Sequence, residues 1–160
     1  TADIFIDDKG INVENWKKNY CPLKKGIIAG AFDIIHPGYI KMLKEAKKYC
    51  NHLTIALHAD PSIERSFKLK PVQNVIERKE ILLSIKYVDE VKIYNLEEDF
   101  LEMLKEFDIR FLGDDYKDGN YTGKNIPIEI IWIERRHDYS TTKLKKNIYK
   151  SIKEINLEKN

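Results

Sequence analysis

A short turn carries the side chains of this chain that are best suited to chemistry. Residues 29–39 read Ala-Gly-Ala-Phe-Asp-Ile-Ile-His-Pro-Gly-Tyr, after the β-branched pair 27–28 and before an amphipathic run that starts at Ile40. A buried strand entering a helix through such a turn places backbone N–H groups, the positive helix end and the His36 imidazole at one point. We therefore predict a phosphate site there, where Gly38 has no Cβ to keep the backbone from a phosphate. The simpler alternative is that His36 caps its own helix or packs on the sheet.

Three further segments carry basic, acidic or hydroxyl side chains. Lys68 and Lys70 lie in a long loop that could close over a triphosphate. Residues 113–116 read Gly-Asp-Asp-Tyr after an apolar run and could contact a hydroxyl-bearing ligand or Mg²⁺. Arg135 precedes the hydroxyl cluster 140–142, where a helix start and an arginine fork would together hold an anion. A solvated loop, an ordinary turn and a helix cap are the respective alternatives.

The elements that must position these segments alternate between continuous apolar runs and amphipathic runs from Lys25 onward. The predicted strands are 26–31, 53–59, 90–94, 109–113 and 128–133, and the predicted helices are 37–50, 75–86, 99–107 and 141–157. This alternation indicates βαβ units, so we predict an α/β fold: a Rossmann-like, doubly wound, parallel five-stranded sheet in one domain over 25–160. Residues 1–24 are interpreted as an N-terminal extension. Ligands in such sheets bind beyond the carboxyl ends of the strands, where the candidate segments converge.

Composition narrows the classes of function. The 160 residues hold 28 basic and 26 acidic side chains, a balance that does not favour an electrostatic nucleic-acid binder. Cys21 and Cys50 form neither a metal-binding spacing nor a disulfide framework, which favours a reduced, cytoplasmic setting. No apolar run approaches the roughly 18 residues of a membrane span. Neither the dinucleotide fingerprint G-x-G-x-x-G nor a P-loop is present in the sequence.

The spacing F-D-x-x-H-x-G-Y over residues 32–39 resembles the nucleotidyltransferase signature G-x-F-D-x-x-H-x-G-H. The Gly-Asp-Asp-Tyr segment resembles the G-D-D-W motif of the cytidylyltransferase branch, and residues 135–142 (Arg-Arg-His-Asp-Tyr-Ser-Thr-Thr) resemble its R-T-E-G-I-S-T-T motif. Arg78, followed by Lys-Tyr-Val-Asp-Glu-Val over 86–91, resembles the branch's helix motif. The resemblance covers about residues 26–147 and is strongest to glycerol-3-phosphate and phosphocholine cytidylyltransferases.

The resemblance implies transfer of CMP from Mg²⁺-bound CTP to a small phosphomonoester, with release of pyrophosphate. Glycerol 3-phosphate, or another phosphorylated precursor of a surface polymer or lipid, is the expected acceptor. The implied catalytic residues are His36, Lys68, Lys70 and Arg135. The implied nucleotide-binding residues are Gly30, Ala31, Phe32, Asp33, Gly38, Tyr39, Arg78, Gly113, Asp115, Tyr116, Ser140, Thr141 and Thr142. No direct metal ligand is assigned, because the triphosphate would carry Mg²⁺ near Asp33, and a homodimer without nucleic acid is expected.

Several positions depart from the family pattern. Tyr39 stands where the signature has its second histidine, and its hydroxyl carries no positive charge near neutrality. Ala31 replaces a threonine, Tyr116 a tryptophan and Asp138 a glycine. Two other functions therefore stay open: an adenylyltransferase of the same fold, and a nucleotide-binding module that has lost catalysis. The presence of His36 together with the loop lysines and the hydroxyl cluster argues against the loss of catalysis.

Overall fold

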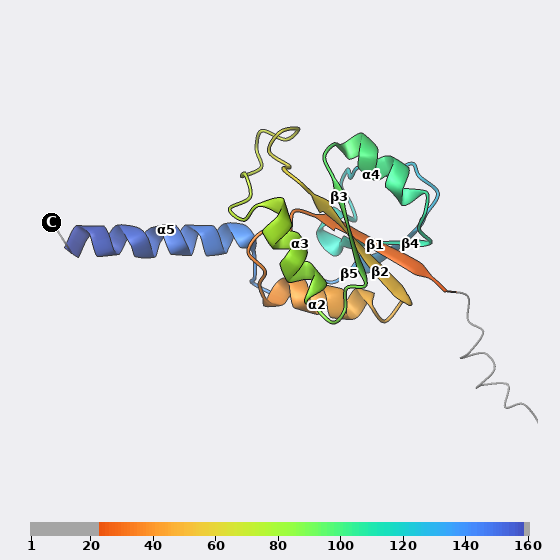
Figure 1. The fold of residues 1–160 in the computed structure, drawn as a ribbon, viewed down its shortest axis with the longest axis horizontal. Helices are drawn as coiled ribbons and strands as arrows, with labels where there is room; N and C mark the ends of the chain where they lie inside the picture. The colour runs from red at the N-terminus through yellow and green to blue at the C-terminus, as the bar shows by residue number, and fades with distance from the viewer. Residues whose placement is uncertain (1–22, 159–160) are drawn as a thin grey trace, which may run out of the picture.

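A parallel five-stranded sheet with the order β3-β2-β1-β4-β5 forms the centre of the computed structural model, which describes residues 23–158 (Figure 1). The elements in chain order are β1 (Lys25–Gly30), α2 (Pro37–Ala46), β2 (His52–His58), α3 (Val75–Leu83), β3 (Glu90–Tyr94), α4 (Glu97–Leu104), β4 (Ile109–Gly113), the 3₁₀ turn η1 (Asp114–Tyr116), β5 (Glu129–Ile133) and α5 (Thr141–Glu158). The predicted doubly wound α/β fold is confirmed. The strand order reverses between β1 and β4, which is where such sheets bind ligands.

Helices cover both faces of the sheet, with α2 and α3 on one face and α4 on the other (Figure 1). Successive residues of a strand point to opposite faces, so neighbouring positions of β1 enter different cores. Ile28 packs in the cluster that contains Leu43 of α2. Ile27 packs in the cluster that contains Phe100 and Leu104 of α4. Burial on both faces explains why the strands read as continuous apolar runs rather than as alternating ones.

Three predicted helices end earlier than their apolar periodicity suggests: α2 ends at Ala46 rather than Cys50, α3 at Leu83 rather than Lys86, and α4 at Leu104 rather than Phe107. Each final turn tightens into i→i+3 hydrogen bonds, which keep the apolar spacing without continuing the α-helix. Helix α4 begins at Glu97 rather than Asp99. The Asp99 carboxylate accepts the Leu96 N–H at 3.0 Å and so caps the helix from within.

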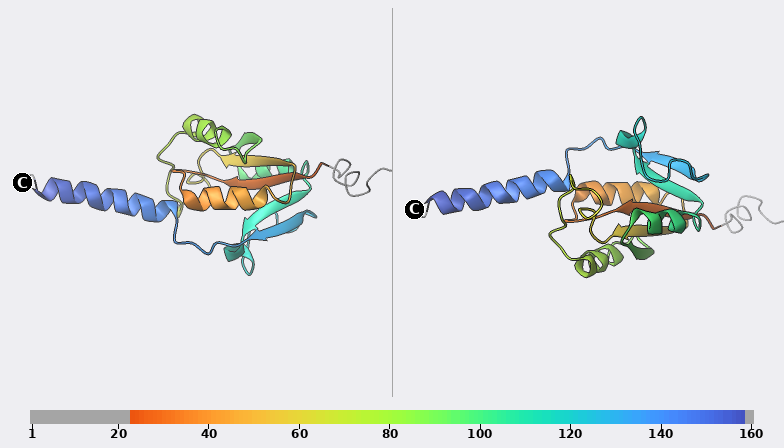
Figure 2. Two further views of the ribbon diagram at one scale, coloured as in Figure 1. Left: turned by 90° about the horizontal axis from the view of Figure 1, so that it is seen from below. Right: turned by 90° about the horizontal axis from the view of Figure 1, so that it is seen from above.

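Helix α5 extends away from the sheet in every view (Figures 1 and 2). Its outer part carries exposed apolar side chains, namely Ile148, Tyr149, Ile152 and Ile155. Among the helices of residues 23–158, none combines the length and apolarity needed to cross a membrane. Nearly all of the predicted extension 1–24 lies outside the described residues, and so does Cys21, whereas Cys50 is a buried free cysteine.

Candidate functional site

The turn after β1 adopts a strained backbone that its neighbours hold in place. Phe32 and Ile34 have φ values of 50° and 54°, in the left-handed region that residues other than glycine rarely adopt. The carboxylate of Asp33 between them accepts the N–H groups of Val72 at 2.9 Å and Gln73 at 3.0 Å. The Gln73 side chain accepts the Ile34 N–H at 3.1 Å. Residues from the loop before α3 therefore fix the shape of the turn.

The floor of the site comes from the same turn. Phe32 is 1% exposed, and its ring lies against Tyr39 with centroids 5.0 Å apart. A Cβ on Gly30 would come within 3.1 Å of the Phe32 ring, so glycine leaves room for that ring. The Ala31 carbonyl accepts Nη1 of Arg78 at 2.7 Å. These residues shape the turn from below.

Arg78 supports the site from beneath rather than from its surface. Its side chain is 1% exposed. Its guanidinium donates to the backbone carbonyls of Ala31, His58, Ala59, Gln73 and Asn74. We therefore assign Arg78 a positioning role in place of the expected contact with the nucleotide. Its guanidinium connects the ends of β1 and β2 to the loop before α3. A helix-face pattern does not reveal this, because the acceptors come from distant segments.

Lys145 of α5 also holds Asp33 in place, and it is not among the site residues that the sequence predicts. Its Nζ lies 2.7 Å from the Asp33 carboxylate and 3.2 Å from the Lys70 carbonyl. Burial alone would raise the pKa of Asp33, but hydrogen bonds from Lys145 and from two backbone N–H groups hold that pKa below its usual value. The available signal was the spacing from Thr141, because residues four apart share one helix face.

His36 is the N-cap residue that precedes α2, but its side chain does not cap the helix. Among the described residues its side chain makes no capping hydrogen bond, which removes the simple capping interpretation. The imidazole is 7% exposed and lies between the rings of Tyr39 and Tyr139, with centroids 4.3 and 6.2 Å away. Burial lowers its pKa, and the charges of His137 and Arg135 lower it further. At neutral pH the ring is therefore a neutral donor held beside a helix N-terminus.

Tyr39 is turned toward α5. Its hydroxyl lies 3.2 Å from Oγ1 of Thr141, and the Thr141 hydroxyl donates to the Asp33 carbonyl at 2.9 Å. Since the Thr141 proton is committed to Asp33, the Tyr39 O–H donates to Thr141. Burial raises the pKa of Tyr39, so the side chain stays neutral. Tyr39 therefore holds α5 against the turn.

The opposite rim of the site lies at the ends of β4 and β5. Arg135 Nη1 donates to the Asp115 carboxylate at 3.0 Å, and the Arg135 N–H donates to Asp114 at 3.1 Å. A Cβ on Gly113 would lie 2.6 Å from Cδ of Arg135, so glycine is needed for this approach. Tyr116 follows on the surface, 38% exposed. Arg135 and Asp115 stay half-exposed and can turn to a ligand.

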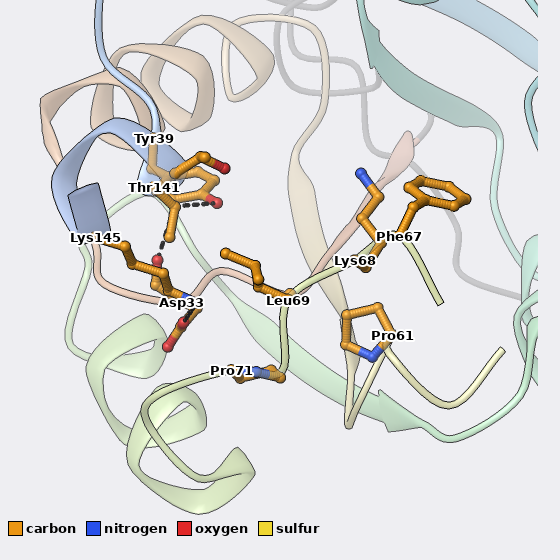
Figure 3. Close-up of a pocket in the computed structure, with 11 residues that line it drawn as sticks. Asp33, Tyr39, Pro61, Phe67, Lys68, Leu69, Pro71, Thr141 and Lys145 are labelled. Carbon is orange, nitrogen blue, oxygen red and sulfur yellow. Dashed lines mark hydrogen bonds and ion pairs between the residues drawn. The ribbon is translucent and has the colours of Figure 1, made fainter. Parts of the chain in front are cut away.

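A cavity of about 300 Å³ opens between the turn, the start of α5 and the loop over residues 59–74 (Figure 3). Asp33, Tyr39, Thr141 and Lys145 lie on one side of it, and Pro61, Phe67 and Lys68 on the other. Its remaining lining residues are Ala31, Leu69, Pro71 and Thr142. The exposed Lys68 thus reaches the site, whereas Lys70 contributes its carbonyl to Lys145.

The first turn of α5 is capped as its sequence predicts. Ser140 Oγ accepts the Lys143 N–H at 3.1 Å, and Thr142 lines the cavity. The side chain of Asp138 is 97% exposed and pairs with Lys143 at 2.7 Å. This carboxylate, which replaces the glycine of the motif, therefore points outward and is neutralised by a neighbouring lysine.

A second polar cluster connects the loop over residues 59–74 to the start of α4. The side-chain atoms of His58, Glu64 and Glu97 that could coordinate a metal ion lie within 4.8 Å of one another. Arg65 donates to Glu97 at 2.5 Å, and Glu64 accepts the Glu97 N–H at 2.9 Å. The His58 ring also lies 3.2 Å from the Asn95 carbonyl. These contacts use the carboxylates to tie the loop to the start of α4.

Comparisons with known proteins agree with this architecture. The model of the cytidylyltransferase-like family matches residues 27–147. Glycerol-3-phosphate cytidylyltransferase of Bacillus subtilis (strain 168) is 34% identical over 128 residues, which cover 79% of this chain and 98% of that protein. The bifunctional protein HldE of Caulobacter vibrioides is 32% identical over 139 residues, which cover 82% of this chain but only 28% of HldE.

Among solved structures, the lipopolysaccharide core biosynthesis protein of Thermoplasma volcanium GSS1 is similar with a TM-score of 0.56 and 24% identity. The match covers 74% of this chain and 99% of that one. At this level of identity the likeness concerns the fold, and it agrees with the sheet topology described above.

Proposed function

The chain belongs to the cytidylyltransferase-like family, and we propose that it transfers CMP from CTP to a small phosphomonoester such as glycerol 3-phosphate, releasing pyrophosphate. The observation that carries this proposal is the cavity at the strand ends, which Tyr39 and the first turn of α5 line, with the His36 ring stacked on Tyr39 at 4.3 Å. The relative that is matched over 98% of its length, a glycerol-3-phosphate cytidylyltransferase, supports the choice of nucleotide and acceptor.

The proposed reaction is an in-line displacement. A phosphate oxygen of the acceptor attacks the α-phosphorus of CTP, and a new P–O bond forms as the bond from the α-phosphorus to the bridging oxygen breaks. Pyrophosphate leaves with the bonding electrons. Such transfers depend mainly on positioning and on stabilisation of developing charge. The protein therefore needs donors around the phosphates rather than a nucleophile of its own.

Each part of the site has a role in this proposal. His36 donates to the phosphates at the start of α2, and Arg135 offers a planar fork to phosphate oxygens. Thr142 and the N-terminus of α5 add a hydroxyl and a positive helix end. Lys68 and Lys70, in the loop that borders the cavity, close over the triphosphate.

The residues of the site do not fit a protein-held Mg²⁺ ion. The Asp33 carboxylate is fully engaged by Lys145 and two backbone N–H groups. Asp115 is paired with Arg135. Among the described residues around the cavity, neither carboxylate is left as an uncommitted ligand. We propose that Mg²⁺ arrives as part of the substrate, bound to the triphosphate.

Pyrophosphate release tests the proposal directly. The protein is incubated with Mg²⁺, CTP or ATP, and a panel of phosphomonoesters that includes glycerol 3-phosphate. Release with CTP and an acceptor is expected, and His36→Ala should abolish it while the protein stays folded. Release with ATP and an acceptor, but not with CTP, would identify an adenylyltransferase. If no pair of nucleotide and acceptor releases pyrophosphate, the proposed activity is rejected and a nucleotide-binding module is the remaining function.

A thermal-shift measurement separates the two nucleotides without an acceptor. A ligand at 100 times its dissociation constant stabilises the folded state by about 2.7 kcal/mol. We expect CTP to raise the melting temperature more than ATP at equal concentration. The reverse order would reject the assignment of the base.

A further inference from the structure

His137, in the loop between β5 and α5, reaches the same point as His36. A Cβ on Gly38 would lie 2.6 Å from Cε1 of His137 and 3.0 Å from both Cε1 and Nδ1 of His36. Both imidazoles therefore crowd the first turn of α2, and only a glycine at position 38 admits them together. The chain brings a second histidine to this helix start from a segment that lies far along the sequence.

The two rings share an unusual feature. Within residues 23–158, the Nδ1 atoms of His36 and His137 are buried and have no hydrogen-bond partner. A buried polar atom without a partner is costly, and such atoms are uncommon outside functional sites. Tyr139 packs against both rings, with centroids 6.2 Å from His36 and 5.6 Å from His137. The structure thus packs two imidazoles against one tyrosine ring and leaves a ring nitrogen of each unpaired.

Tyr39 leaves a position for a second donor unfilled. Its hydroxyl proton is directed to Thr141, and its buried phenol stays neutral. The side chain at position 39 therefore offers neither a positive charge nor a free donor to a phosphate at the start of α2. His137 is the neighbouring side chain with an uncommitted ring nitrogen.

We propose that His137 supplies the second imidazole of the transfer site and donates, together with His36, to the phosphates of the nucleoside triphosphate. The inference rests on the proposed function, and it adds a catalytic residue that the motif alone does not contain. As the α-phosphorus is attacked, negative charge shifts toward the departing pyrophosphate, and a second positioned donor stabilises that charge. Packing against Tyr139 is the competing role, and the two differ in their consequences for kcat.

The test uses the full chain and the pyrophosphate-release assay. His137→Ala should lower kcat about 100-fold, which is typical of losing one preorganised donor, with little change in melting temperature. Should that variant fail to fold, His137→Asn keeps a similar shape and should show the same loss. The matched control is His52→Ala, because His52 pairs with Glu90 at the other end of β2, away from the cavity.

A rescue variant asks whether an imidazole is what the site requires. The Tyr39 ring lies 4.3 Å from that of His36, so Tyr39→His places a new imidazole beside it. In the His137→Ala background, Tyr39→His should restore kcat at least tenfold. A double variant no faster than His137→Ala would overturn the inference, as would a His137→Ala enzyme whose kcat stays within twofold of the wild type.

Failure of the two proposals can be told apart. If His36→Ala is inactive and His137→Ala is fully active, the proposed function stands and the inference falls. If the unmodified chain releases no pyrophosphate with any pair, the proposed function falls, and calorimetric binding of Mg²⁺–pyrophosphate decides the inference. Binding should then be at least tenfold weaker in His137→Ala, and equal binding in the two proteins would overturn it.

Discussion

Lys145 in the second turn of α5 forms a 2.7 Å ion pair with Asp33 in the strained turn after β1, and the two side chains are only 17% and 4% exposed. The pair joins the C-terminal helix to the residues that shape the site. Thr141, one helical turn earlier, donates to the Asp33 carbonyl and strengthens the same connection. The first turn of α5 is therefore part of the site, although the rest of that helix extends away from the sheet (Figure 2).

Lys145→Met tests the weight of this ion pair. Removing one partner of a buried pair leaves the other charge uncompensated, so we expect the free energy of unfolding to fall by about 3 kcal/mol. Urea denaturation measures the change. The control is Lys150→Met, because Lys150 pairs with Glu154 on the exposed surface and should change stability by less than about 0.5 kcal/mol. Equal losses in the two variants would contradict a special role for Lys145.

The same carboxylate should give the protein a characteristic response to acid. Although burial opposes it, hydrogen bonding from Lys145 and from the Gln73 and Val72 N–H groups keeps the pKa of Asp33 below its usual value. A carboxyl with a depressed folded-state pKa stabilises the protein above its unfolded pKa of about 3.9, and the contribution disappears as pH falls through the folded value. Asp33→Asn should therefore show a smaller loss of stability between pH 7 and pH 3 than the wild type. Urea denaturation at both pH values measures it, and identical losses would show that Asp33 is not coupled to folding.

Arg78→Lys separates charge from hydrogen-bonding geometry. The guanidinium donates to five backbone carbonyls, which a lysine with its single nitrogen cannot reach together. Leaving two or more buried carbonyls without donors should lower the free energy of unfolding by about 3 kcal/mol, which urea denaturation would detect. Arg136→Lys is the control, since that side chain is 84% exposed. A stable Arg78→Lys protein would show that the loop before α3 does not depend on this guanidinium.

His36 and His137 should also influence each other in the absence of substrate. Burial is the main cause that lowers the pKa of His36, and the charge of His137 adds to it. His137→Asn removes that charge and should raise the pKa of His36. An NMR titration of the His36 Cε1–H resonance measures the shift. An unchanged or lower pKa would place the His137 charge too far away to act on His36.

The sequence predicted the elements well because burial on both faces gives β1 and its neighbours a distinctive apolar pattern. It also predicted that the turn after β1 and the hydroxyl cluster 140–142 lie at one edge of the sheet, because parallel strands all end there, and Tyr39, Thr141 and Thr142 do line one cavity. It could not show that Arg78 and Asp33 are committed to backbone and lysine partners. Those contacts join segments distant in the chain, and only the folded structure brings them together.

The role of His137 was hidden for a related reason. The motif lacks a histidine at position 39, whereas the loop before α5 brings His137 to the neighbouring Gly38. Local spacing cannot reveal a replacement that arrives from another segment. The ends of α2, α3 and α4 also differ from the predicted ones, because the i→i+3 turns that close these helices keep their apolar spacing.

The outer part of α5 leads to the last prediction, which concerns the expected homodimer. Ile148, Ile152 and Ile155 are each at least half exposed and are spaced four and three residues apart, as in the apolar seam of a coiled coil. The Lys150–Glu154 pair lies on the opposite face of the helix, which stays exposed to solvent when two such helices pair. We expect two copies of the chain to associate through α5.

Ile148→Lys combined with Ile152→Lys should convert the dimer to a monomer of 18.9 kDa in analytical ultracentrifugation, because each interface would then hold four buried cations. Asn147→Lys adds a similar charge outside the seam and should leave the dimer intact. Since Ile148 and Ile152 are exposed and do not line the cavity, the monomeric variant should keep its kcat. A wild-type protein that sediments as a monomer would reject the pairing of α5, and a dimer that survives both isoleucine substitutions would place the interface elsewhere.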